Sequence, residues 1–234
     1  MLQKSIAFVC KKTTIMKKPI QFAGYTAIIL ALTYVFMFVL YGAIIEGAAP
    51  NSSAQEVLEN IQNNYRYNWS ANFVGYILFG AVLVFLTYGL QKHQRSFSPH
   101  LSTTAAVFGY IWSGLVIASG MIGNILLQDI MQTGPETAEN SLQLVNAVST
   151  VTEGLGGGNE FVGGIWSLLV SIAFLKNETS PKALIILGTL VGISGIATLF
   201  PIELFTEIFG MSQLLWFFYL GVFLLRRPAI EITN

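Results

Sequence analysis

The residues best suited to chemistry gather in one glycine-rich stretch, TEGLGGGNEFVGGIW, at residues 152–166. Glu153 and Glu160 place two carboxyl groups there, directly before an apolar segment. One interpretation is helix capping. Asn159 is a favourable N-cap, and Glu160 then falls in the first turn, where the helix dipole stabilises a carboxylate by about 0.3–1 kcal/mol. The glycines would end the preceding helix and allow a sharp turn, so capping explains every residue except Glu153.

The second interpretation is a ligand site, because other polar residues border the neighbouring apolar segments. Polar groups at the edge of a membrane are costly unless they are solvated or paired, so they could line an outward-facing pocket. Such acids would suit a polar or cationic ligand or a divalent metal, although no specific metal site and no cofactor is predicted. The predicted ligand-binding residues are Asn124, Asp129, Asn159, Glu160, Glu203, Glu207 and Gln213.

The sequence lacks the residue patterns of common enzymes. His93 and His100 do not have the HExxH spacing of a zinc protease, and neither a GxSxG motif nor a lysine-bearing phosphate loop occurs. The single cysteine, Cys10, excludes an intrachain disulfide. No catalytic residue is therefore predicted, and the sequence favours a protein that is not an enzyme.

The elements that must position these residues are apolar helices. Hydrophobic residues make up 53% of the 234-residue chain and charged residues 10%, against about 25% charged in soluble proteins. About 20 apolar residues suffice to cross a membrane as a helix. The sequence predicts an all-α, polytopic transmembrane bundle of six helices, at residues 20–45, 71–90, 103–127, 160–175, 183–202 and 208–225.

Basic residues predict the orientation of this bundle. Eleven of the twelve lysines and arginines fall on one side if the helices alternate, and only Arg66 falls on the other, with most of the acids. Both termini are thus expected in the cytoplasm. The predicted organisation is a basic N-terminal segment at 1–18, a membrane domain at 19–227 and a cytoplasmic tail at 228–234.

Two stretches outside the apolar runs have helical periodicity, SAQEVLENIQNN at 53–64 and TAENSLQLVNAVSTV at 137–151. Each is expected to be a short amphipathic helix on the outer face, lying on the bundle or on the outer leaflet, with partner binding as the alternative. After each comes a similar motif, NFVGYI at 72–77 and EFVGGI at 160–165. This similarity suggests an internal repeat of 52–127 in 137–202.

Small residues mark where helices should come close, because lipid provides no hydrophobic drive for helix association. Gly188, Gly192 and Gly195 form one such series, and Ser119 with Gly123 forms another. Both are expected to pack helices within one chain, with pairing between two chains as the alternative.

The second half of the chain resembles a known family. The residues that carry the likeness are GGIWSLLVSIAFLKNETSPKALIILGTLVGISGIATLFP at 163–201 and QLLWFFYLGVFLLRR at 213–227. They resemble a bacterial family of six-helix integral membrane proteins known as domain of unknown function 4386. The resemblance implies a bacterial inner (cytoplasmic) membrane and supplies no catalytic residues.

Two functions remain open. The first is a non-enzymatic membrane protein that binds a small molecule or lipid at its outer face, or serves as an accessory subunit. The alternative is a small uncoupled transporter, since the spans carry no ionisable group near the midplane and no proline breaks them, although Gly109, Gly114 and Gly120 could. Expected partners are membrane lipids and either another membrane protein or a second copy of the chain. No nucleic acid is expected.

Overall fold

The fold is entirely helical in the part of the chain that this computed structural model describes, residues 2–49, 51–157 and 160–226. The all-α prediction is therefore confirmed. The α-helices are α1 (Leu2–Val39), α2 (Ala54–Asn63), α3 (Tyr65–Asn72), α4 (Phe79–Gln94), α5 (Pro99–Ile130), α6 (Ala138–Thr152), α7 (Phe161–Leu175), α8 (Lys182–Ala197) and α9 (Glu203–Arg226). They are joined by two π-helical segments, η1 (Leu40–Ile44) and η2 (Phe73–Leu78), by a 3₁₀ turn, η3 (Pro135–Thr137), and by a kinked segment, η4 (Glu153–Gly157), that is not helical at Gly156.

Five stretches of the described chain are long and apolar enough to cross a membrane, as expected of a multi-pass membrane protein. They are Ile20–Ile44, Tyr65–Gln94, Pro99–Ile130, Ala138–Leu175 and Glu203–Arg226. The sequence predicts a sixth, but the corresponding helix α8 has only 16 residues, about 24 Å at 1.5 Å per residue. Likewise α7 has 15 residues, so the fourth stretch reaches its length only by including α6.

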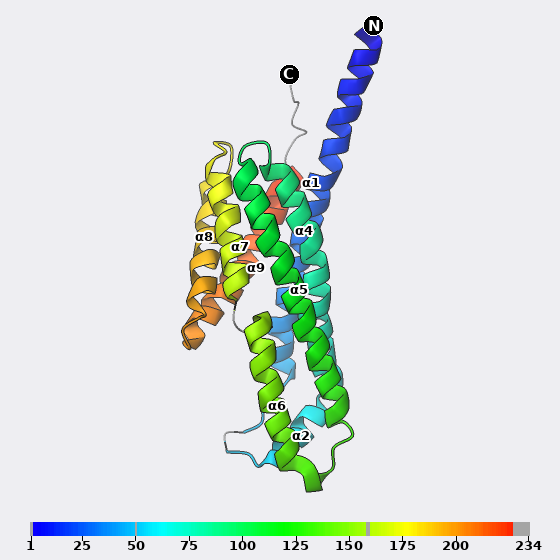
Figure 1. Ribbon diagram of the computed structural model, residues 1–234, viewed down its shortest axis with the longest axis vertical. Helices are drawn as coiled ribbons and strands as arrows, with labels where there is room; N and C mark the ends of the chain where they lie inside the picture. The colour runs from blue at the N-terminus through cyan, green and yellow to red at the C-terminus, as the bar shows by residue number, and fades with distance from the viewer. Residues whose placement is uncertain (1, 50, 158–159, 227–234) are drawn as a thin grey trace.

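Six helices close into a ring in the order α1, α4, α5, α7, α8 and α9, with α9 packed against α1. Figure 1 shows the ring as a long bundle, with α6 and α2 at the end away from the two termini. The centre of the ring is filled by buried aromatic and aliphatic side chains, including Trp166, Trp216 and Phe217, none of which is exposed. The core is therefore packed solid over the part where all six helices run together.

Glycines allow the closest contacts in this ring. A Cβ atom at Gly164 of α7 would lie 2.6 Å from the backbone nitrogen of Ile196 in α8, and one at Gly192 would lie 2.6 Å from Leu168 Cβ. Gly123 faces Asn72, and the Ser119 hydroxyl donates to the carbonyl of Thr152. Both small-residue series thus pack helices within one chain, as predicted.

The two amphipathic stretches form α2 and α6, as expected. A capping box begins α2, in which Ser53 and Glu56 bond each other's backbone nitrogens. Leu58 of α2 packs with Ile130 and Ala138 in a small cluster of its own. In Figure 1, α6 runs alongside the C-terminal half of α5, so it lies on the bundle and extends it.

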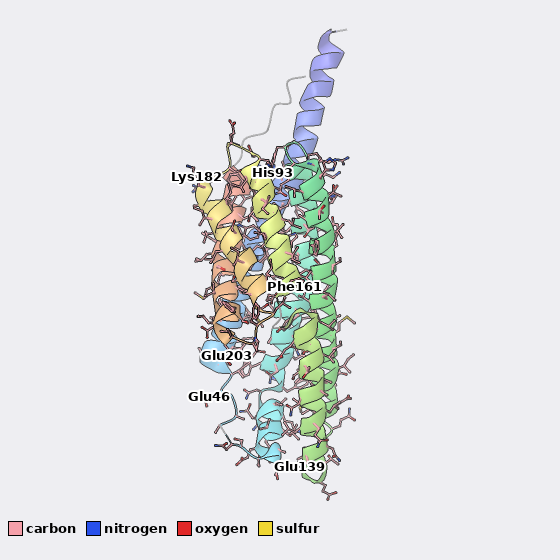
Figure 2. The ribbon with its side chains drawn as sticks, turned by 60° about the vertical axis from the view of Figure 1, so that its left-hand side comes forward. Glu46, His93, Glu139, Phe161, Lys182 and Glu203 are labelled. Carbon is pink, nitrogen blue, oxygen red and sulfur yellow. The ribbon has the colours of Figure 1, made fainter. Side chains whose placement is uncertain are left out.

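Charged side chains separate between the two ends of the molecule. Figure 2 shows Lys182 and His93 at the end nearer the termini, and Glu46, Glu139 and Glu203 in the opposite half. The helices that would form the suggested repeat pair as two hairpins, α4 with α5 and α7 with α8. The repeat itself remains a prediction.

Candidate functional site

A cavity of about 330 Å³ lies where the short helix α7 begins. At the level where α7 begins, α5 continues beyond the six-helix ring. Fewer helices surround the interior there, and space is left between them. Trp112 lies 13 residues into α5, so the cavity is about 20 Å or more from the basic end of that helix. Its lining residues are Thr33, Tyr34, Met37, Phe38, Tyr41, Gly75, Tyr76, Phe79, Trp112, Val116, Gly156, Glu160, Thr206, Glu207, Phe209 and Gly210.

Both π-helical segments and the kink at Glu153–Gly157 contribute to the cavity wall: Tyr41 lies in η1, Gly75 and Tyr76 in η2, and Gly156 in the kink, η4. π-Helical turns widen a helix locally and are common at functional sites. Gly156 has a φ of 110°, which favours glycine, and a Cβ there would lie 3.4 Å from Val116. The helix irregularities of this molecule therefore concentrate around one space.

Glu160 enters the cavity from the N-terminus of α7. Its backbone nitrogen donates to the Thr198 hydroxyl at 2.9 Å, and its carbonyl accepts from Gly164 at 2.7 Å. Glu160 is itself the N-cap residue, and its side chain makes no capping hydrogen bond. The predicted position of Glu160 in the first turn is thus wrong by one residue, because the helix begins one residue later than expected. Asn159, the predicted N-cap and a predicted site residue, lies outside the described residues.

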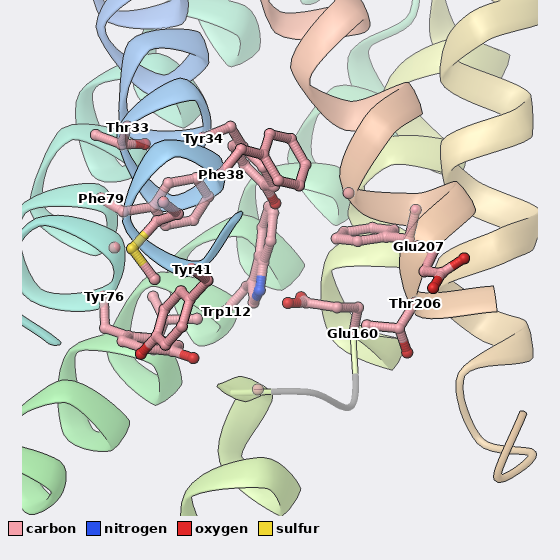
Figure 3. A pocket seen from close by; sticks show the side chains of 16 residues that line it. Thr33, Tyr34, Phe38, Tyr41, Tyr76, Phe79, Trp112, Glu160, Thr206 and Glu207 are labelled. Carbon is pink, nitrogen blue, oxygen red and sulfur yellow. The ribbon is translucent and has the colours of Figure 1, made fainter. Parts of the chain in front are cut away.

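The carboxyl group of Glu160 points toward the indole nitrogen of Trp112 (Figure 3). Trp112 is 1% exposed, and its indole N–H interacts with the facing Glu160 carboxyl group. Neither Trp112 Nε1 nor the buried Glu160 Oε2 completes a hydrogen bond of ordinary geometry among the described residues. An unsatisfied buried polar group costs about 1–3 kcal/mol, so a ligand group that completed these hydrogen bonds would be stabilised in the cavity.

Aromatic rings surround this pair and close the cavity toward the basic end. Phe79 meets Trp112 edge to face at 5.4 Å between centroids, and Tyr34 meets Phe79 at 5.8 Å. Beyond Trp112, Trp166 and then Trp216 follow, each 5.6 Å from the ring before it. The cavity therefore ends at a packed aromatic layer.

Comparison with known proteins identifies the family of the chain. The family model described as "Domain of unknown function (DUF4386)" matches residues 22–227. The chain belongs to this family. The match contains every residue that lines the cavity, so the site lies within the DUF4386 domain. No curated protein and no solved structure matches the chain.

The DUF4386 chain brings two of the predicted site residues to the cavity, Glu160 and Glu207. Glu207 lies at the rim, and its carboxyl group points away from Trp112 in Figure 3. Gln213 is fully buried in the core, where its Oε1 atom accepts from the Ser167 hydroxyl at 3.3 Å. Glu203 is exposed at the start of α9.

The other two predicted residues lie farther out along α5. Asn124 is 8% exposed and eight residues beyond Val116, about 12 Å along the helix. Asp129 is exposed near the end of α5. These two residues and the cavity are therefore at different levels of the molecule. In the described part of the chain, no group of three or more His, Cys, Asp or Glu residues is placed to hold a metal ion.

Sequence reasoning missed the aromatic half of the site. Trp112, Tyr34 and Tyr76 read as ordinary apolar residues of membrane spans. One signal was present: tryptophan and tyrosine favour membrane interfaces, whereas Trp112 and Tyr34 lie well inside their spans. Each carries a polar atom that must find a partner there.

Proposed function

We propose that this protein binds a small amphipathic molecule in the cavity beside Glu160, within the outer half of a bacterial cytoplasmic membrane. The observation that carries the proposal is the buried pair of Trp112 Nε1 and Glu160 Oε2, which face each other in a mainly apolar cavity without completing a hydrogen bond of ordinary geometry. Binding sites for small molecules commonly combine apolar walls with a few such polar groups. The family name states no function, so the proposal rests on this geometry.

The distribution of charge supports the orientation. Lys92, Lys176 and Arg226 lie at the ends of helices on the side of the N-terminus, and lysine and arginine are retained on the cytoplasmic side of membranes. In this orientation both termini are cytoplasmic and the cavity is closer to the outer face. Its rim includes Phe38, 43% exposed, and Tyr41, 53% exposed, so a molecule from the outer leaflet has access.

The aromatic layer favours binding over the alternative, uncoupled passage of a solute. Trp112, Trp166 and Trp216 are each at most 1% exposed and stand in contact between the cavity and the basic end. A facilitator would need these rings to move apart. A receptor or lipid-binding subunit needs only the outer opening.

Native mass spectrometry of protein extracted gently from its own membrane tests this function. A Cβ atom at Gly210 would make only ordinary contacts, at 3.6 Å to Phe38 and 4.0 Å to Tyr34, so Gly210→Leu fills the cavity without disturbing the backbone. The matched control is Gly114→Leu, because nothing lies within 4 Å of a Cβ at Gly114.

We expect the wild-type chain and Gly114→Leu to retain a discrete small mass that Gly210→Leu loses. Equal retention by Gly210→Leu would place the molecule elsewhere, and a wild-type chain without any added mass would overturn the binding function. Added protein mass would instead support an accessory subunit.

A further inference from the structure

We propose that the ligand is a lipophilic organic cation that also carries an oxygen acceptor, as in an amino alcohol or its esters. This inference rests on the proposed binding function and specifies its substrate class. It follows from the charge, the aromatic faces and the open hydrogen-bonding atoms of the cavity, taken in turn below.

The charged residues among the described lining of the cavity are all acidic. The lining includes Glu160, whose carboxyl group enters the space, and Glu207 at the rim, and among the described lining residues there is no lysine, arginine or histidine. A carboxylate held in an apolar space is strongly disfavoured without a counter-charge. A cation in the cavity supplies that charge, whereas an anionic ligand would add to the repulsion.

The walls suit a soft cation rather than a hydrated metal ion. Aromatic faces attract ammonium groups within about 6 Å, and aromatic cages are used to recognise quaternary ammonium ligands. Tyr41, Tyr76 and Trp112 are placed around the space that Glu160 enters (Figure 3). Met37, Phe38 and the other apolar lining residues favour a ligand with a hydrocarbon part.

The hydrogen-bonding atoms of the cavity require one more group on the ligand, a hydrogen-bond acceptor. Trp112 Nε1 faces the Glu160 carboxyl group but completes no hydrogen bond of ordinary geometry among the described residues, and an ammonium group accepts no hydrogen bond. An oxygen a few bonds from the nitrogen would accept from Trp112 while the ammonium lies beside Glu160 Oε2. Such a ligand gives the Trp112 N–H an acceptor and the Glu160 carboxylate a counter-charge, whereas a simple alkylamine gives only the counter-charge.

Three matched probes separate these contributions: benzyl(2-hydroxyethyl)dimethylammonium, its neutral analogue with carbon in place of nitrogen, and benzyl(ethyl)dimethylammonium, which lacks the hydroxyl group. Binding is measured by titration calorimetry on the full chain in lipid nanodiscs. We expect the hydroxyl-bearing cation to bind the wild-type chain at least about tenfold more tightly than the neutral analogue, which corresponds to about 1.4 kcal/mol.

Amino-acid substitutions test which residue causes the preference for the cation and which causes the preference for the hydroxyl group. Glu160→Gln should remove the preference for the cation over the neutral analogue, and Glu203→Gln, which removes an exposed carboxylate from the same side, should keep it. Trp112→Phe should remove the advantage of the hydroxyl group and keep the preference for charge. Circular dichroism confirms that Glu160→Gln is folded, since the backbone of this residue, not its side chain, bonds Thr198.

The outcomes separate the two proposals. If the neutral analogue binds as tightly as the cation and Gly210→Leu abolishes both, the cavity binds ligands but the cationic class is wrong. If Gly210→Leu binds all three probes as the wild-type chain does, the site itself is wrong. A cation preference that survives Glu160→Gln overturns the role of Glu160.

Discussion

A single hydroxyl group, that of Thr198, holds the residue at the centre of the site. It accepts from the backbone nitrogen of Glu160 at 2.9 Å and donates to the carbonyl of Gly195 at 2.7 Å. The beginning of α7 is thereby tied to the end of α8. The position of the Glu160 side chain depends on a contact 38 residues away in sequence.

Replacing Thr198 with valine should lower the free energy of unfolding by about 1–3 kcal/mol, because the Glu160 N–H loses its acceptor in a partly buried place. Thermal unfolding in detergent measures the change. Thr150→Val is the control, since the Thr150 hydroxyl is exposed and bonds only within its own helix. Equal stability of the two variants would contradict the structural role of Thr198.

At the residue scale, the sequence predicts Glu160 as a candidate site residue but not the side chains that surround it. The glycines and carboxylates around Glu160 are conspicuous in the chain, and two of the predicted site residues do line the cavity. Trp112 was not predictable as their neighbour. Its side chain reaches Glu160 only because Gly163 has no side chain, and a Cβ at Gly163 would lie 2.6 Å from the Trp112 ring.

At the scale of elements, the contact between α7 and α8 sets the geometry of the site. A Cβ at Gly164 would lie 2.7 Å from the carbonyl carbon of Gly195, so the two backbones touch. Hydropathy predicts these helices well. It does not predict that they are short or that π-helical turns occur at Leu40–Ile44 and Phe73–Leu78, because such turns depend on packing rather than on residue type.

Gly164→Leu should therefore separate α7 from α8 and greatly reduce the yield of folded protein, because backbone atoms cannot move aside as a flexible side chain can. Size-exclusion chromatography of the detergent-extracted chain reports the loss. Gly114→Leu, in open space on α5, should elute as the wild-type chain does. A monodisperse Gly164→Leu variant would mean that the two helices are not so close.

At the scale of the whole molecule, charge gives the bundle a direction. Acidic residues such as Glu139 lie at the end away from the termini (Figure 2), whereas the α7–α8 connection is flanked by Lys176 and Lys182. The proposed orientation places the first end outside and the second in the cytoplasm.

Cysteine labelling in whole cells tests this orientation in a Cys10→Ser background. Glu139→Cys should react with a membrane-impermeant maleimide, because residue 139 is exposed on the proposed outer side. Glu178→Cys, exposed in the α7–α8 connection, should react only after the cells are permeabilised. The reverse pattern would invert the molecule and place the cavity nearer the cytoplasm.

The contact of α1 with α9 has a consequence for biosynthesis. Tyr34 and Phe38 of α1 and Phe209 and Gly210 of α9 line the cavity. While the ribosome still holds α9, α1 has one face without its final neighbour and the cavity has no wall on that side. The cavity is thus completed only after α9 has left the ribosome, so a chain truncated before α9 would be synthesised without the proposed binding site.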